Sequence, residues 1–267
     1  MSMRSVVDLV QDNPETFQVL LFASIMAAVW WVEKVIGGQS TIGKLQHTSI
    51  NAIFMSGALP VQLVMMLLCV TVANWTAKEH FGLIYLLPNA GNGWIKYGVA
   101  FLALDFLDYC YHLIAHRWGA IWKFHLVHHT DRFVDVSTTF REHPGETFIR
   151  TCFLIAWVLL CGANLQVLVL RQTVQSLFNI LQHTTFRLSP GLARVLGWFF
   201  ITSNLHHAHH HFKLPGTNCN YGDVFSIWDR MFGTYVDLHH ERPVFGLDTH
   251  MGEDLSVWHL LRCTTAD

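Results

Sequence analysis

Charged side chains are scarce in this sequence. Asp, Glu, Lys and Arg together make up 13% of the 267 residues, whereas apolar residues make up 52%. Together with a mean hydropathy of +0.32, this composition argues against an ordinary soluble protein and predicts a membrane protein. A basic surplus is also missing, because the formal net charge is −2. Without extra cations to neutralise phosphates, we expect no nucleic-acid partner.

Paired cysteines are absent as well. The six cysteines stand singly, at Cys69, Cys110, Cys152, Cys161, Cys219 and Cys263. With no Cys-x-x-Cys pair, the sequence argues against both a disulfide-stapled secreted domain and a cysteine zinc site. Residues 1–15 contain four charged residues and no apolar core, unlike a cleaved secretory signal. This pattern favours reduced cysteines that serve ordinary packing.

Two familiar metal motifs are missing too. The chain has no Glu-x-x-His, the motif of soluble di-iron carboxylate bundles. It has no His-Glu-x-x-His either, which excludes the zinc proteases that use this motif. Any metal site must therefore use another set of ligands.

Three long apolar stretches are present in the first half of the chain. They are Thr16–Val32, Ile50–Trp75 and Trp94 to about His112. A transmembrane helix needs about 20 mostly apolar residues, so each stretch predicts a membrane span. The third stretch carries Asp105 and Asp108, and acidic residues at membrane depth are rare and usually functional.

A fourth apolar region, Phe148–His183, is interrupted near its middle by Gly162–Asn164. This pattern predicts a helical hairpin whose arms cross the membrane and return; the alternative is one span followed by an amphipathic helix. A hairpin would place the histidine-rich segments 112–143 and 183–211 on the same membrane face. Their side chains could then meet.

The basic residues predict which face this is. Under the hairpin topology, thirteen of the 17 Lys and Arg residues fall on the histidine-rich face. The opposite face receives Arg4, Lys78 and Lys96. By the positive-inside rule, we expect the histidines in the cytoplasm and the acidic N-terminus outside.

Histidine is the abundant polar residue, with 18 copies. The clusters with regular spacing are His112 and His116 (HLIAH), His125, His128 and His129 (HLVHH), and His206, His209 and His210 (HHAHH), with His183 as a ninth candidate at the end of the hairpin. Residues three or four apart share one face of a helix, so each cluster can present its imidazoles to one small volume. Two copies of the His-x-x-His-His spacing predict two metal ions.

Asp105 and Asp108 precede His112 by seven and four positions, on the same helical face. We expect one of these carboxylates to accept the second ring N–H of a ligating histidine.

Several alternatives remain open from spacing alone. His207, His210 and His211 fit the His-x-x-His-His spacing equally well. His129 and Asp131 match part of a two-histidine, one-carboxylate iron site, but that arrangement leaves the other histidines unused. The remaining histidines are expected to be ordinary core or surface residues: His47, His80, His239, His240, His250 and His259.

The order of the three histidine motifs in a membrane protein resembles the fatty acid hydroxylase/sterol desaturase superfamily. The stretches HLIAHR, IWKFHLVHH and TTFREHPGE resemble its central signature, and CNYGDVFSIWDRMFGTY resembles its C-terminal one. The resemblance covers roughly residues 100–247. That family typically leaves about fourteen residues between the first histidine of its last motif and the Asn of NYG. Counting back from Asn220 selects His206.

The resemblance implies a site with two iron ions, although purified protein can carry zinc. These ions would use O2 as co-substrate to hydroxylate or desaturate a fatty-acyl or sterol-like membrane lipid. Because the chain has no Gly-x-Gly-x-x-Gly fingerprint, a separate reductase or electron carrier is implied. Residues expected to support the ligands are Asp105, Asp108, Arg141, His143, Glu146 and Asn220.

The predicted fold is all-α: a polytopic transmembrane bundle with a cytoplasmic helical cap that carries the dinuclear site. We expect N-terminal spans in residues 1–95, the catalytic region with its hairpin in 96–247, and a tail in 248–267. A histidine-rich metal transporter or a haem-binding membrane protein is the competing interpretation. A transporter would carry its histidines midway along the spans, whereas here they cluster at span ends.

Overall fold

The computed structural model describes residues 14–37, 40–86, 93–213, 216–238, 243–250 and 256–262. Within these ranges the regular structure is helical, with two isolated β-bridges and no sheet. The all-α prediction is therefore confirmed for the part of the chain that the structure describes. Four segments are long and apolar enough to cross a membrane: Gln18–Gly37, Thr41–Leu86, Ile95–Arg117 and Pro144–Cys161.

The first two long helices are α2 (Pro14–Gly37) and α3 (Thr41–Glu79). The Ser40 side chain caps α3 by accepting a hydrogen bond from the backbone N–H of Gly43. Helix α3 begins nine residues before the apolar stretch at Ile50, and its first turns bury Lys44 and His47. Buried charged partners, rather than lipid, stabilise this end of the helix, which is why hydropathy alone predicted a shorter element.

Helix α4 (Gly93–Arg117) contains the third predicted span and is followed at once by α5 (Gly119–His129). A 3-10 turn, η2 (Val136–Phe140), then leads into the hairpin. Asp135 and Thr138 form a capping box at the start of η2, which fixes the path of the chain directly after the second histidine cluster.

The predicted hairpin is formed by α6 (Pro144–Cys161) and α7 (Leu165–Gln182). Gly162 ends α6 with a positive φ of 75°, and a Cβ at this position would lie 2.5 Å from the carbonyl oxygen of Phe81. The Asn164 side chain accepts the N–H of Val167 and starts α7. Only α6 is among the candidate spans. The second arm has a polar face and is not a candidate span, so the structure has the turn of the predicted hairpin but agrees with the alternative of one span followed by an amphipathic helix.

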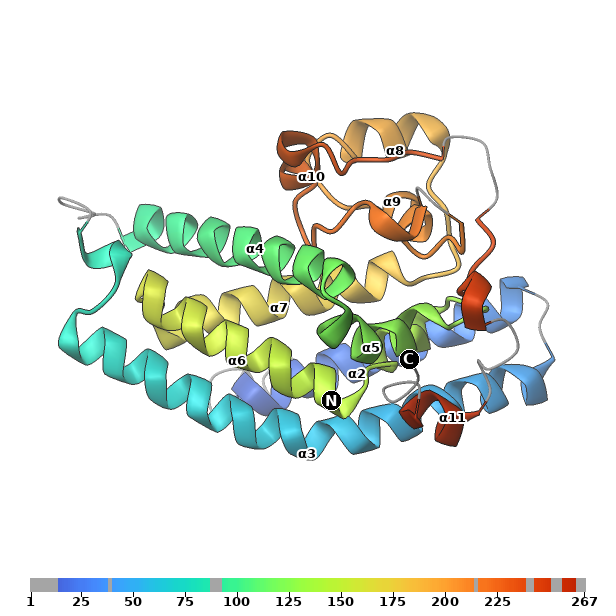
Figure 1. The fold of residues 1–267 in the computed structure, drawn as a ribbon, viewed down its shortest axis with the longest axis horizontal. Coiled ribbons are helices and arrows are strands. Elements are labelled where there is room, and N and C mark those ends of the chain that lie inside the picture. The colour runs from blue at the N-terminus through green and yellow to red at the C-terminus, as the bar shows by residue number, and fades with distance from the viewer. Residues whose placement is uncertain are drawn as a thin grey trace, which may run out of the picture.

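The chain after the hairpin forms a C-terminal lobe, which we define as residues 190–213 and 216–238. Its helices are α8 (Pro190–Leu196), α9 (Ser203–His209), η3 (Gly216–Asn218) and α10 (Ile227–Phe232). Figure 1 shows the long helices lying side by side, with the lobe gathered near the end of α7. In 243–250 and 256–262, the described helices are η4 (Asp248–His250) and α11 (Val257–Arg262). Leu260 of α11 is buried beside Ile50 and Phe54 of α3.

Candidate metal centre

All nine histidines that the sequence singled out lie together in two groups. The first group is His112, His116, His125, His129 and His209, and the second is His128, His183, His206 and His210. Within each group, one nitrogen from every ring lies within 4.8 Å of the corresponding nitrogens of the others. Every member is buried or half-buried.

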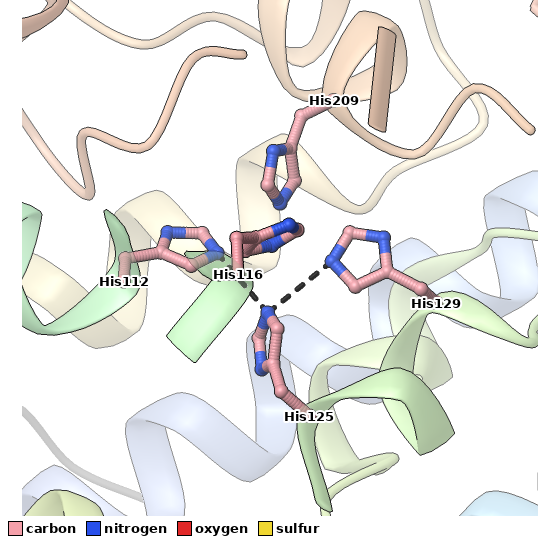
Figure 2. Close-up of side chains that lie close together, drawn as sticks. All are labelled: His112, His116, His125, His129 and His209. Carbon is pink, nitrogen blue, oxygen red and sulfur yellow. Dashed lines mark hydrogen bonds between the residues drawn. The ribbon is translucent and has the colours of Figure 1, made fainter. Parts of the chain in front are cut away.

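The first group draws on three helices (Figure 2). His112 and His116 lie one turn apart at the end of α4, and His125 and His129 lie one turn apart on α5. His209 enters from α9. The Nε2 atom of His125 lies 3.2 Å from the Nε2 atoms of both His112 and His129.

Outward-facing acceptors fix the orientation of several rings in this group. The Nδ1–H of His112 donates to the backbone oxygen of Tyr221 at 2.9 Å, and that of His209 donates to the oxygen of Cys219 at 2.6 Å. The Nδ1–H of His125 donates to the Glu146 carboxylate at 2.6 Å. Because a carbonyl or carboxylate only accepts, Nδ1 carries a proton in each of these rings, and a ring with that single proton keeps a lone pair on Nε2.

The second group repeats this arrangement. The Nδ1–H of His128 donates to the backbone oxygen of Arg141 at 3.2 Å, and that of His183 donates to the oxygen of Asn179 at 2.8 Å. The Nε2 of His183 lies 3.1 Å from that of His128 and 2.9 Å from that of His206. His210 completes the group from the C-terminus of α9, one turn after His206.

The chemistry of these donors fits metal ions. Converging Nε2 lone pairs repel one another and cannot hydrogen-bond to each other, but a cation between them satisfies them all. Burial lowers the pKa of His128, His206, His209 and His210 well below its ordinary value, and lowers that of His183 to about 4. These rings are therefore neutral at pH 7, as metal ligands must be. Each group can hold one ion.

The structure distinguishes the two possible registers of the last motif. His207 points its Nε2 at the backbone oxygen of Thr184, and His211 bonds to the backbone of Val244. Neither belongs to the two groups. His206, the residue selected by counting from Asn220, lies in the second group.

Of the histidines expected not to be ligands, His80 and His259 are exposed. The side chains of His239, His240 and His250 lie outside the described residues.

Four of the supporting residues contact the ligands or hold their segments. Glu146 accepts the hydrogen bond from His125, and the carbonyl of Arg141 accepts that from His128. The Arg141 guanidinium binds the oxygen of Val127. His143 caps α6 by accepting the N–H of Gly145. Asn220, with a φ of 50°, donates to the carbonyls of Leu205 and Val236 and accepts the N–H of Val236.

Asp105 and Asp108 do not have the role that we expected, because neither accepts a hydrogen bond from a histidine. Asp105 accepts from the indole N–H of Trp228, and Asp108 forms a bidentate ion pair with Arg171 at 2.5 and 2.7 Å. Buried carboxylates need donors, and these two obtain theirs from residues of other elements, Trp228 and Arg171. The ring of His112 uses the carbonyl of Tyr221 instead.

Sequence reasoning missed a buried network beside the centre. Lys44 donates to Glu33 at 3.0 Å and to Asp135 at 2.9 Å, and His47 contacts Asp131 at 2.9 Å. Asp131 is thus engaged by His47 and does not complete a two-histidine, one-carboxylate site with His129. Glu33 and Lys44 flank apolar stretches, where charged residues are ordinary. No local pattern in the sequence therefore indicated that Lys44 pairs with the distant Asp135.

A cavity of about 820 Å³ leads to both groups. Its histidine end is formed by His112, His125, His128, His183 and His206. Its apolar wall comes from the candidate spans α2 and α3, through residues such as Phe22, Met26, Met55, Leu59 and Met66. The cavity therefore joins these two helices to histidines of both groups.

These features define a class of protein: a membrane-type chain, helical in its described residues, with a histidine cluster at the end of a cavity that has an apolar wall. The model of the fatty acid hydroxylase family matches residues 97–234, more than half of the chain, and the chain belongs to this family. The resemblance inferred from the histidine motifs is thereby confirmed.

Named relatives come from distant organisms. Alkylglycerol monooxygenase of Danio rerio is 29% identical over 163 residues, which cover 60% of this chain and 34% of the relative. Ornithine lipid hydroxylase of Rhizobium tropici is 34% identical over 135 residues, which cover 49% of this chain and 39% of the relative. Methylsterol monooxygenase 1 of Rattus norvegicus is 33% identical over 137 residues, which cover 51% of this chain and 44% of the relative. The chain spans less than half the length of each relative. No solved structure gives a significant match.

Proposed function

We propose that this chain is a membrane-bound oxidoreductase that uses O2 to hydroxylate or desaturate a C–H bond of a membrane lipid. The observation that carries this proposal is the convergence of nine histidines at the end of a cavity whose other wall consists of candidate membrane spans. The printed names of the relatives are those of lipid monooxygenases and hydroxylases, which favours hydroxylation.

The nine histidines are proposed to hold two iron ions, one in each group. Imidazole nitrogen suits iron, copper, nickel and zinc, and zinc binds such sites more tightly than Fe(II), so overexpressed protein is expected to carry some zinc. When bound, the iron pair supplies the activation of O2. The protein's own task is to keep each Nε2 unprotonated, through acceptors such as Glu146 and the carbonyls of Tyr221 and Asn179.

The lipid is proposed to enter from the bilayer between α2 and α3, whose side chains form the apolar wall of the cavity. The electron donor is proposed to be a separate protein, since the sequence carries no dinucleotide fingerprint. The C-terminal lobe would then be a cytoplasmic cap over the metal site, in line with the distribution of Lys and Arg. A metal transporter is disfavoured because His112 and His116 occupy the last turns of α4 rather than its middle.

Lipid mass spectrometry of cells with and without the protein tests the proposal. Hydroxylation predicts a lipid heavier by one oxygen atom, which should contain 18O when the cells grow under 18O2. Desaturation predicts a lipid lighter by two hydrogen atoms, whose formation stops without O2. A variant with His128→Ala serves as the inactive control. If the two lipid profiles are identical at normal O2, the proposed function is wrong.

A further inference from the structure

The ligand His183 lies at the very end of its helix. It is the C-cap residue of α7, so the helix supports it from one side only. Helix ends tend to fray, because their last carbonyls lack partners within the helix. The ring nevertheless has a defined place, with its Nε2 2.9 Å from that of His206. The chain directly after His183 therefore needs a support from outside α7.

One peptide group provides this support. The carbonyl oxygen of Thr184 accepts a hydrogen bond from Nε2–H of His207 at 2.9 Å, and the N–H of Thr185 donates to Oε1 of Glu33 at 2.8 Å. These two backbone atoms belong to the same peptide group, which is planar and rigid. Side chains from α9 and α2 thus hold one rigid unit at both of its polar ends.

Both of these side chains are shielded from solvent, since Glu33 and His207 are each 2% exposed. A hydrogen bond in such a low-dielectric environment is electrostatically stronger than one in water. His207 also directly follows the ligand His206 on α9, so its bond to Thr184 joins two ligand-bearing segments of the second group. The histidine that the register of the last motif leaves without a metal thereby gains a role beside it.

Glu33 contacts a second segment of this group as well. The N–H of Val136 donates to both carboxylate oxygens of Glu33 at 3.3 Å. Val136 begins η2, which joins His128 to Arg141, the residue whose carbonyl orients the His128 ring. One carboxylate of α2 therefore contacts the backbone of segments that carry two different ligands. Lys44, at 3.0 Å, compensates its charge and allows this strong acceptor to stay buried.

The position of Glu33 separates it from the histidine motifs. The family model matches residues 97–234, and α2 precedes this region. Among the described residues, Glu33 belongs neither to the two histidine groups nor to the cavity lining. Its effect on the centre must therefore pass through the backbone that it holds.

We propose that Glu33 is a positioning residue for the metal ion of the second group. Together with His207, it holds the peptide group between Thr184 and Thr185 and thereby keeps the imidazole of His183 directed at the ion. This inference rests on the proposed function only for the presence of that ion. It adds a requirement for the N-terminal helix that the histidine motifs do not contain.

Two variants of Glu33 separate this role from the ion pair. Glu33→Leu and Glu33→Gln both remove the charge that pairs with Lys44, but only Gln keeps an oxygen that can accept the N–H of Thr185. Zinc-loaded protein in detergent is suitable, because zinc undergoes no redox reaction. Competition with a chelator measures the dissociation constant of each ion. Glu33→Leu should weaken one ion about tenfold and leave the other unchanged, and Glu33→Gln should recover most of this loss.

Single-ion backgrounds identify the affected ion. His209→Ala removes a ligand of the first group, and His210→Ala removes one of the second. Glu33→Leu should weaken zinc binding in the His209→Ala protein and leave it unchanged in the His210→Ala protein. His207→Leu should show the same selectivity. Combined with Glu33→Leu, it should cost less than the product of the two separate effects, because both side chains hold one peptide group.

Gln18→Leu is the matched control. Gln18 lies on the same helix as Glu33 and donates to Thr173 of α7 at 2.7 Å, away from the end of α7 that carries His183. Losing this contact between the two helices should leave both zinc affinities at the wild-type values.

Three results with the Glu33 variants would overturn the inference: unchanged zinc affinities in Glu33→Leu, equal weakening of both ions, or equal weakening in the Leu and Gln variants. Each would leave Glu33 with a role in folding alone. A wild-type chain that binds no zinc in the second group would overturn the inference together with the proposed iron site. If the variants behave as expected but no lipid is oxidised in cells, the positioning role stands and the proposed function fails.

Discussion

A single carboxylate, that of Glu146, connects the metal centre with the cavity. One of its oxygens accepts the Nδ1 proton of His125, and the residue is also among those that line the cavity. The same residue thus touches both the histidines and the cavity wall. His125 shares its group with His112 and His129, so a change at Glu146 is expected to alter the first metal position more than the second.

Glu146→Gln keeps the size of this side chain but removes its charge. We expect metal affinity at one of the two positions to fall about tenfold or more, as is usual when a carboxylate partner of a histidine ligand is lost. Competition with a chelator, followed by the metal content of the protein, measures this. Glu79→Gln at the exposed end of α3 should have no effect. Equal loss of both metals, or of none, would contradict the assignment of Glu146 to the first group.

The ligand assignment makes a sharper prediction at His209. Because the first group contains His209 and the second does not, His209→Ala should lower the metal content from about two ions per chain to about one and abolish lipid oxidation. Elemental analysis of purified protein gives the count. His211→Ala is the control, since His211 lies two residues further, belongs to neither group, and its ring bonds to the backbone of Val244. One metal per wild-type chain would exclude the dinuclear site.

At the scale of elements, the turn between α6 and α7 positions His183 for the second group. Gly162→Ala places a Cβ against the backbone of Phe81 at a positive φ. We expect this variant to lose about 1–2 kcal/mol or more of unfolding free energy. Thermal unfolding in detergent provides the measurement. Gly98→Ala on α4, where a Cβ would meet nothing within 4 Å, should be neutral or slightly stabilising. Equal stability of both variants would show that the turn tolerates a side chain.

Much of the element pattern was predictable from the sequence. Apolar runs gave the positions of α2, α3 and α4, and Gly162–Asn164 gave the turn of the hairpin. The length of α3 was not predictable, because its first turns are stabilised by the distant Asp131 and Asp135. The same holds for Asp105 and Asp108: helical spacing placed them correctly on the face of His112, but their partners Trp228 and Arg171 come from other elements.

For the whole molecule, the proposed topology can be tested with single cysteines in a background that lacks the native ones. Cysteines replacing Arg132 and Lys213, which are exposed near the two histidine groups, should both be protected from an impermeant thiol reagent in intact cells. A cysteine replacing Lys78, at the opposite end of α3, should be labelled.

Opposite labelling of positions 132 and 213 would separate the two histidine-rich segments and contradict the hairpin topology. Labelling at both of these positions, with protection at position 78, would instead reverse the orientation and leave the metal site intact.

The network of Glu33, Lys44, His47, Asp131 and Asp135 also has a consequence for biogenesis. Its cations come from α3, but two of its three carboxylates follow the second histidine cluster directly. During synthesis, Glu33 emerges before Lys44 and can pair with it, but the carboxylate partners of His47, Asp131 and Asp135, emerge only much later. We therefore expect the N-terminal pair of helices to reach its final packing only after the middle of the chain lies beside it. Since the two histidine groups also need His209 and His210, we expect metal loading to come later still.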